Sequence, residues 1–172
     1  MRIYFDFEFT GLRQMTTPIS LGCAAEDGSW FYAQFIDYDE TQVDDWIRQH
    51  VINHLWYGDH STEQVPDRIG TREQVAEHLT RWLKKWERVE MCGDCLAYDW
   101  VLFCELFGGA FGIPKNVYYI PFDLATVLML RGIDPDINRE EFAGMTDGGP
   151  KHNALWDARV IRACFAKLEV AP

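Results

Sequence analysis

A pair of carboxylates separated by a single residue, Asp6 and Glu8, lies within the first nine residues of the chain. The pair alternates with Phe5, Phe7 and Phe9. Because a β-strand directs alternate side chains to opposite faces, the spacing predicts three phenylalanines on a core face and both carboxylates on the other. That second face could be a solvated strand surface or a metal site, since carboxylate oxygens suit Mg²⁺ or Mn²⁺. The pair alone supports both interpretations.

Two aspartates far along the chain could join this pair. Asp99 begins a predicted helix in CGDCLAYDWVLF, and Asp157 lies in the otherwise core-facing helix of KHNALWDARVIRACF. Taken singly, Asp99 could be a helix cap and Asp157 an exposed helix residue. If all four carboxylates meet, their repulsion requires a compensating cation. Such a set can bind two divalent ions about 4 Å apart, which is the arrangement that supports phosphodiester hydrolysis.

His152 adds a titratable group to this set. It lies five residues before Asp157, after the Gly-Gly-Pro segment 148–150, on a predicted loop that runs into the final helix. The unperturbed pKa of histidine, near 6.5, suits a group that accepts a proton from an attacking water. A loop histidine without a role is the alternative. We assign that alternative to the other histidines: His50, His54, His60 and His78.

The elements that must position these groups begin with three predicted strands, over residues 2–9, 19–24 and 30–36. The turn signal Glu26-Asp27-Gly28 joins the second strand to the third. Connections this short predict a three-stranded antiparallel meander.

Helices and strands alternate after the meander. Capping-box spacing at Thr71 and Gln74 predicts the start of a long helix. The order of elements predicts an α/β fold with a mixed sheet, in one domain over residues 1–172. The predicted elements are helices from about Asp44 and over 71–86, 99–107, 124–130 (capped by Asp123) and 153–168, strands over 88–93 and 117–120, and loops over 57–70 and 134–150.

Composition narrows the class of protein. The 172 residues are 48% hydrophobic, which predicts one globular domain with a real core. No apolar run approaches the roughly 20 residues that span a bilayer, and the acidic N-terminal strand is not typical of a secretory signal. The net charge of −11 argues against general affinity for polyanions. If the protein binds nucleic acid, we expect it to do so at a small site, with its local acidity neutralised by divalent metal.

The five cysteines predict reduced thiols in a cytoplasmic protein, because they are odd in number and lie mostly in apolar segments. Cys92 and Cys95 have C-x-x-C spacing. A structural zinc site needs a second ligand pair, which does not follow, and a thioredoxin-like motif needs a different strand–helix setting. We therefore expect neither zinc nor redox chemistry at this pair.

Three segments together resemble a known family. DFEFTGL (6–12) is similar to the D-x-E-x-T-G-L motif of the DEDDh 3′-to-5′ exonucleases, which have a ribonuclease H-like fold. Asp99, in AYDW, matches the aspartate of the second motif, and HNALWD (152–157) matches the third, H-x-A-x-x-D. The motifs occur in the family's order and span nearly the whole chain. Within the superfamily, the chain most resembles the polyadenylate-specific exoribonucleases of the ribonuclease AS type.

The resemblance implies a role for each catalytic position. Asp6, Glu8 and Asp157 would hold the metal that activates water, and Asp6 would bridge to a second metal. Asp99 would reach the second metal directly or through water, and His152 would be the general base. The implied cofactor is Mg²⁺, two ions per site, with Mn²⁺ as an alternative.

The resemblance also implies contacts to the substrate. Thr10 and Gly11 would present backbone to the terminal nucleotide, and Leu12 would wedge against its base. Candidate stacking platforms are Tyr98, Trp100 and Trp156, for each of which a core role is the simpler interpretation. Phe9 has the parity of the core face, so we do not include it. Asp94 stands where several relatives carry asparagine or histidine, and its role stays open.

The function implied is a two-metal 3′-to-5′ exoribonuclease that releases nucleoside 5′-monophosphates from single-stranded RNA, with a possible preference for adenosine-rich 3′ ends. The alternatives are a proofreading-type DNA exonuclease and an inactive scaffold that binds protein. The scaffold is disfavoured because all five catalytic positions are present. A homodimer is expected from the resemblance alone, and no membrane partner is expected.

Overall fold

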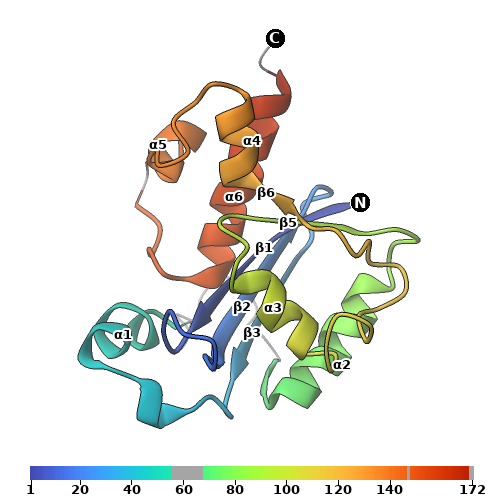
Figure 1. Cartoon of the computed structure of the whole chain (residues 1–172), viewed down its shortest axis with the longest axis vertical. Helices are drawn as coiled ribbons and strands as arrows, with labels where there is room; N and C mark the ends of the chain where they lie inside the picture. Colours follow the sequence, from blue (N-terminus) through green and yellow to red (C-terminus); the bar gives the residue numbers. More distant parts are fainter. Residues whose placement is uncertain (56–67, 147, 171–172) are drawn as a thin grey trace.

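A computed structural model describes residues 1–55, 68–146 and 148–170, and Figure 1 shows the arrangement of its helices and strands. Within these residues, six strands form one mixed sheet in the order β4-β3-β2-β1-β5-β6. The first three strands form the predicted antiparallel meander, and β4, β5 and β6 each pair in parallel with a neighbour. The bounds are β1 Arg2–Phe9, β2 Pro18–Ala25, β3 Trp30–Phe35, β4 Ile69–Gly70, β5 Glu90–Gly93 and β6 Phe122–Asp123.

Two helices, α2 and α4, start at side-chain caps that the sequence predicted. The Thr71 hydroxyl accepts from the Gln74 N–H while the Gln74 side chain accepts from the Thr71 N–H, which confirms the capping box of α2. Asp123 caps α4 as predicted. No described helix is long and apolar enough to cross a bilayer. The bounds are α1 Asp45–His50, α2 Arg72–Leu83, α3 Asp99–Glu105, α4 Leu124–Leu130, α5 Arg139–Ala143 and α6 Ala154–Val170.

The two faces of β1 have different partners, as its alternation predicts. Phe5 and Phe7 are buried in a core cluster with residues of α2 and α3. Tyr4, on the other face, packs in a second cluster with residues of α4 and α6. The sheet therefore lies between two helical layers (Figure 1), and the face that carries Asp6 and Glu8 is the face that α6 covers.

The structure corrects several predicted elements. The predicted strand over 117–120 is wrong: only an isolated bridge joins Val117 to Val89, and the paired strand is β6, a few residues later. Aromatic residues at 118 and 119 favoured a strand, but strand pairing depends on a neighbour rather than on propensity. Helix α2 ends at Leu83, so Trp86 lies beyond it, although the Trp86 ring still contacts Trp82.

Both predicted loops contain regular structure. Within 134–150, α5 is capped by Asn138 at its start and ends at Gly144, whose φ of 73° is the left-handed conformation that glycine favours. The segment was predicted as a loop because so short a helix shows no apolar period. In the other loop, β4 adds Ile69 and Gly70 to the sheet. The rest of that prediction falls largely on residues 56–67, which lie outside the described part.

Candidate active site

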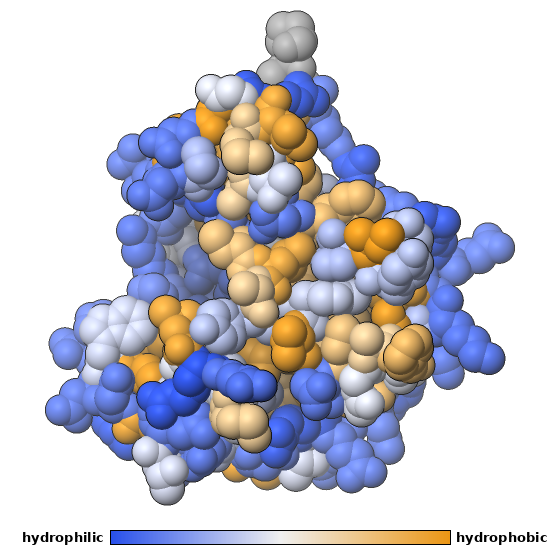
Figure 2. Space-filling view, viewed as in Figure 1, coloured by the Kyte–Doolittle hydropathy of each residue, from blue (hydrophilic) through white to orange (hydrophobic). Residues whose placement is uncertain are grey.

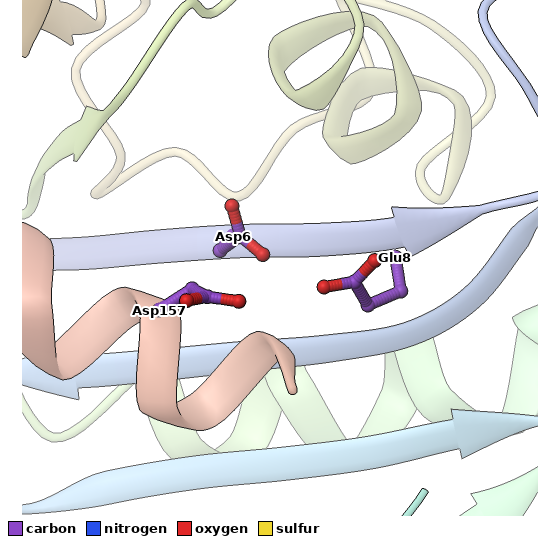
Figure 3. Close-up of side chains that lie close together, drawn as sticks. All are labelled: Asp6, Glu8 and Asp157. Carbon is purple, nitrogen blue, oxygen red and sulfur yellow. The ribbon is translucent and has the colours of Figure 1, made fainter. Parts of the chain in front are cut away.

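Three carboxylates meet between the central strand β1 and the first turns of α6. Carboxylate oxygens of Asp6, Glu8 and Asp157 all lie within 4.8 Å of one another. Figure 3 shows the three side chains converging on the space between strand and helix. All three residues are partly buried. The strand spacing therefore does more than expose a solvated face: it places two carboxylates against a third, 149 residues later in the chain than Glu8.

Gly22 allows α6 to reach this position. In the β1–β2 ladder Gly22 lies directly opposite Asp6. A Cβ at Gly22 would lie 2.2 Å from the backbone carbonyl atoms of Ala154, the first residue of α6. Any larger residue would collide with the helix backbone. The hydrogen atom of glycine thus sets the closeness of α6 to the sheet and the distance between Asp157 and Asp6.

Asn153 anchors the start of α6. Its side-chain oxygen accepts from the Trp156 N–H at 3.2 Å, and its amide donates to the His54 carbonyl at 3.3 Å. The residue is buried, 6% exposed. The first contact caps the helix and the second ties it to the segment after α1. Both contacts fix the turn that carries Asp157.

Asp99 reaches β1 from α3, whereas Asp157 reaches it from α6. Asp99 begins α3, is 7% exposed, and its Oδ1 accepts the Phe7 N–H at 2.9 Å. Phe7 is the residue between Asp6 and Glu8 in the sequence. The predicted helix-start position is confirmed, and a hydrogen bond to the catalytic strand itself holds the side chain there.

Electrostatics show that this cluster needs a proton or a cation. Burial, together with the charges of neighbouring carboxylates, raises the pKa of Asp6 well above its usual range. Burial and the charges of Asp157 and Asp99 raise the pKa of Glu8 to about 9. Burial raises the pKa of Asp157 to about 7 and that of Asp99 to about 6, the latter despite the lowering effect of the Phe7 N–H. At neutral pH the anionic cluster is unfavourable unless a cation compensates it.

His152 lies at the edge of the same site in a left-handed backbone conformation, with φ of 61°. This conformation is uncommon for a residue other than glycine and is found where the surroundings enforce it. The His152 ring contacts the edge of Trp46, with ring centroids 5.1 Å apart. Burial, with the nearby His50, His54 and Lys151, lowers the pKa of His152. The imidazole is therefore neutral at neutral pH, the form that accepts a proton.

One cleft of about 770 Å³ contains all five predicted catalytic residues. Gly11 and Leu12 also line it, and Leu12 is 79% exposed. Thr10 differs: it is fully buried, its hydroxyl donates to Gln42 at 2.7 Å, and its N–H bonds to the Thr17 carbonyl. Thr10 therefore closes the turn after β1, and its N–H already has a partner within the chain. The residues that the structure brings together are Asp6, Glu8, Asp99, His152, Asp157, Gly11 and Leu12.

Sequence reasoning missed several residues of the cleft wall. Phe9, set aside on parity, packs against the core cluster of Phe5 and Phe7 and also lines the cleft, where the strand register shifts after Glu8. Tyr98 was named as a candidate stacking platform; it lines the cleft and stacks on Phe9, with ring centroids 5.5 Å apart. Trp46 and Arg13 line it as well, and no motif marked them. The core role stated for Trp100 and Trp156 agrees with their packing in the two main clusters.

The open position Asp94 has a partner. Its carboxylate accepts two hydrogen bonds from Arg139, at 2.7 and 3.1 Å, from α5. Arg139 also donates to the carbonyls of Pro135 and Ile137. A bidentate pair of this kind is strong and directional. Asp94 lines the cleft, and its pairing connects the segment before α6 to the end of β5.

The C-x-x-C cysteines and four of the histidines were predicted to have no role in the site. Cys92 is buried and Cys95 exposed, and both are free thiols. Among the histidines without an assigned role, His50 and His54 lie close enough to His152 to affect its pKa. His78 lies on α2, and His60 falls outside the described residues.

Strand order and acidic cluster together define the class of the protein: a ribonuclease H-like α/β fold whose site is built on a central strand and on helices from both flanking layers. The family model of the 3′-5′ exoribonuclease Rv2179c-like domain matches residues 1–168. The chain belongs to this family, and it is a hydrolase of the 3′-5′ exoribonuclease kind.

Two curated relatives agree with this assignment. They are 3′-5′ exoribonuclease Rv2179c and 3′-5′ exoribonuclease MT2234.1, from two strains of Mycobacterium tuberculosis. Each is 29% identical to this chain over 119 residues, which cover 68% of this chain and 67% of the relative.

Replacing Gly22 with alanine should damage both stability and activity. The new methyl group would push α6 from the sheet, at a cost of about 1–3 kcal/mol in the free energy of unfolding. A shift of Asp157 by about 1 Å should lower kcat on RNA by roughly 10²-fold. Thermal unfolding and RNA digestion by Gly22→Ala test this. Gly28→Asn is the control, because the space around Gly28 is open and asparagine tolerates its positive φ. Wild-type activity in Gly22→Ala would contradict the role assigned to this contact.

Proposed function

We propose that the chain removes nucleotides from the 3′ end of single-stranded RNA with two divalent metal ions, Mg²⁺ or Mn²⁺, and releases nucleoside 5′-monophosphates. The observation that supports this most directly is the meeting of three carboxylates within 4.8 Å. Their raised pKa values fit the donor set of a hard cation, which prefers oxygen ligands. In this proposal Asp6, Glu8 and Asp157 would hold metal, and Asp99 would add a carboxylate from α3.

The residues around the carboxylates have separable tasks in the hydrolysis. Bound metal ions would supply charge stabilisation at the scissile phosphate and a more acidic water. His152 accepts a proton from the water whose oxygen bonds to phosphorus. The bond from phosphorus to the 3′ oxygen of the preceding nucleotide breaks, and that oxygen leaves with the shortened RNA. The tasks match the DEDDh type, to which the three motifs point.

At the terminal nucleotide, Gly11 and Leu12 are the proposed contacts from the turn after β1. Gly11 has φ of 142°, so a substitution with a side chain there would be strained. Leu12 exposes most of its apolar surface beside the carboxylates, as a wedge against a base requires. A preference for adenosine-rich ends follows from the resemblance to the ribonuclease AS type, and we include it in the proposal on that ground.

Digestion of labelled oligonucleotides tests the proposal. We expect 5′-labelled single-stranded RNA to shorten one nucleotide at a time with Mg²⁺ or Mn²⁺ and to survive in EDTA. Homopolymer 3′ tails of A, C, G and U compared at equal concentration test the adenosine preference. Matched DNA oligomers separate the alternative, because cleavage of DNA alone would identify a proofreading-type enzyme. Intact RNA under every metal would contradict the proposal.

Metal should stabilise the protein more at high pH than at low pH. Carboxylates whose pKa is raised by folding contribute stability below their unfolded pKa, near 4, and lose it as pH rises through the folded pKa. For Asp99, Asp157 and Glu8 that loss extends from about 4 to about 9. Metal-free protein should therefore melt at a lower temperature at pH 8.5 than at pH 6.

Adding Mg²⁺ at about 100 times its Kd should restore roughly 2.7 kcal/mol, or about 5–10 °C. At the same Mg²⁺ concentration, the stabilisation should be smaller at pH 6, because protons already neutralise part of the carboxylate cluster. Melting curves at both pH values, with EDTA or Mg²⁺, measure the difference. An equal Mg²⁺ effect at both pH values would contradict metal binding by these carboxylates.

A homodimer remains a proposal that the resemblance supports. Figure 2 shows hydrophobic residues over α4 on the face in view. Exposed apolar side chains gather on α4 and on the segment that ends in β6, and a second copy could cover them. Sedimentation of the purified chain decides between monomer and dimer. The exposed apolar side chains of this surface are Tyr119, Ile120, Phe122, Met129 and Leu130.

A further inference from the structure

The catalytic cleft continues into a second hollow of about 500 Å³. Ala97 and Tyr98 line both spaces, so the two hollows are contiguous at the start of α3. The turn after β1 also contributes to both, with Arg13 in the cleft and Met15 in the second hollow. A chain whose 3′ end lies at the carboxylates therefore has a second hollow directly beside the cleft that could hold the nucleotide before it.

Tyr98 stands between the two hollows on a rigid support. Its ring stacks on Phe9 with an interplanar angle of 29°, and Phe9 ends the catalytic strand β1. Tyr98 is partly exposed and lines both hollows, so the part of its ring that Phe9 does not cover is accessible. An aromatic ring held in this way can stack on any of the four bases, because every base has a π-face.

The second hollow presents further apolar surface to solvent. Met15 is 75% exposed and Val101 is 54% exposed, from the turn and from α3 respectively. Such residues on both sides of a hollow offer contact to a flat base rather than to a phosphate. The charged residues that line this hollow are Arg72, which is paired with Asp37, and Glu105, whose carboxylate disfavours a phosphate there.

Arg13 supplies the positive charge that a polyanion needs on this path. Carboxylates dominate the charge of the cleft, and the chain as a whole carries a net charge of −11. Arg13 is exposed, and none of the ion pairs between described residues includes it. Hydrogen bonds to the Asp39 carboxylate and, to a smaller degree, the charge of Arg13 lower the pKa of Asp39, so this carboxylate lies nearby. The two residues form no direct ion pair, and the exposed guanidinium can turn to a phosphate near the junction of the two hollows.

We propose that this second hollow is the binding site for the nucleotide before the terminal one, with its base stacked on Tyr98 and with Arg13 contacting a phosphate on the 5′ side of the scissile bond. The inference rests on the proposed function and extends it: the substrate is a single strand of several nucleotides rather than a dinucleotide. Affinity then depends on residues outside the catalytic cluster.

Two substrates test the inference. One is a five-nucleotide RNA, and the other is the p-nitrophenyl ester of a nucleoside 5′-monophosphate, which has a leaving group but no preceding nucleotide. For Tyr98→Ala, kcat/KM on the RNA should fall about 10- to 100-fold, through KM, and on the ester by a much smaller factor. Tyr98→Phe should keep RNA activity, since the ring carries the effect. Phe111→Ala, at an exposed phenylalanine that lines neither hollow, is the control.

Arg13 has an independent readout in salt dependence. Each phosphate contact to a single strand contributes about −0.7 to the slope of log affinity against log salt concentration. Arg13→Ala should reduce the steepness of that slope by about this amount on the five-nucleotide RNA, and Arg13→Lys should restore it. Arg81→Ala, at an exposed arginine of α2 that lines neither hollow, should leave the slope unchanged.

The outcomes separate the inference from the function on which it rests. Equal losses on RNA and ester in Tyr98→Ala would overturn the inference while leaving exonuclease activity intact, as would an unchanged salt slope in Arg13→Ala. Hydrolysis of neither substrate by the wild-type protein would overturn the proposed function itself, and the inference with it.

Discussion

Asp6→Asn should lower kcat on RNA by at least about 10³-fold and at the same time stabilise the metal-free protein. The activity loss follows because Asp6 lies on the central strand within reach of both Glu8 and Asp157. Losing a ligand of a catalytic metal removes several kcal/mol of transition-state stabilisation, and each 1.36 kcal/mol is a factor of about ten in rate.

The stability gain has the opposite sign because the amide carries no charge. Asp6 is buried among carboxylates whose charges all raise its pKa. Asparagine has nearly the same shape and removes that repulsion, so the melting temperature in EDTA at pH 8 should rise by about 2–8 °C. Mg²⁺ should then add little further stability.

Kinetics together with melting curves in EDTA and in Mg²⁺ measure all three effects. Asp136→Asn, at an exposed aspartate far along the chain, is the matched control and should change none of them. A variant that is inactive yet less stable than wild type in EDTA would show that Asp6 has a structural role and would argue against a cation site.

His152→Asn should lower kcat by about 10²- to 10⁴-fold while the stabilisation by Mg²⁺ persists. The factor is typical of removing a general base. Asparagine is chosen because it tolerates the left-handed conformation of this position, whereas alanine adds a backbone cost. The carboxylates proposed to hold metal are not changed, so the Mg²⁺-induced rise in melting temperature should match that of wild type.

His152→Ala should show the same kinetic defect with a somewhat lower melting temperature, and His78→Ala on α2 is the control. Undiminished turnover in His152→Asn would remove the imidazole from the mechanism. Loss of the Mg²⁺ effect would instead show that His152 is needed to hold the metal site together.

Local patterns predicted the parts of the fold that depend on neighbouring residues. The alternation in β1, the capping box of α2 and the cap of α4 depend on side chains a few residues apart, and all three are confirmed. The failures depend on distant partners. The aromatic segment near Val117 has high strand propensity but only an isolated bridge, and Ile69 joins the sheet because β3 offers an edge.

The sequence by itself determined which residues are the candidates for the chemistry: two carboxylates on one face of a strand, two helix aspartates and a histidine near the final helix. Their types and spacing are local properties of the chain. Only the tertiary structure decided that these groups meet. Asp157 reaches β1 because Gly22 has no side chain under α6, and Asp99 is held by a backbone N–H of β1.

The walls of the cleft were also decided by packing. Phe9 turns toward the cleft at a register shift, and Tyr98 stacks against it from the start of α3. Neither position follows from periodicity, since both depend on contacts between segments almost 90 residues apart. Close packing of distant segments sets such distances, and a one-dimensional pattern does not contain them.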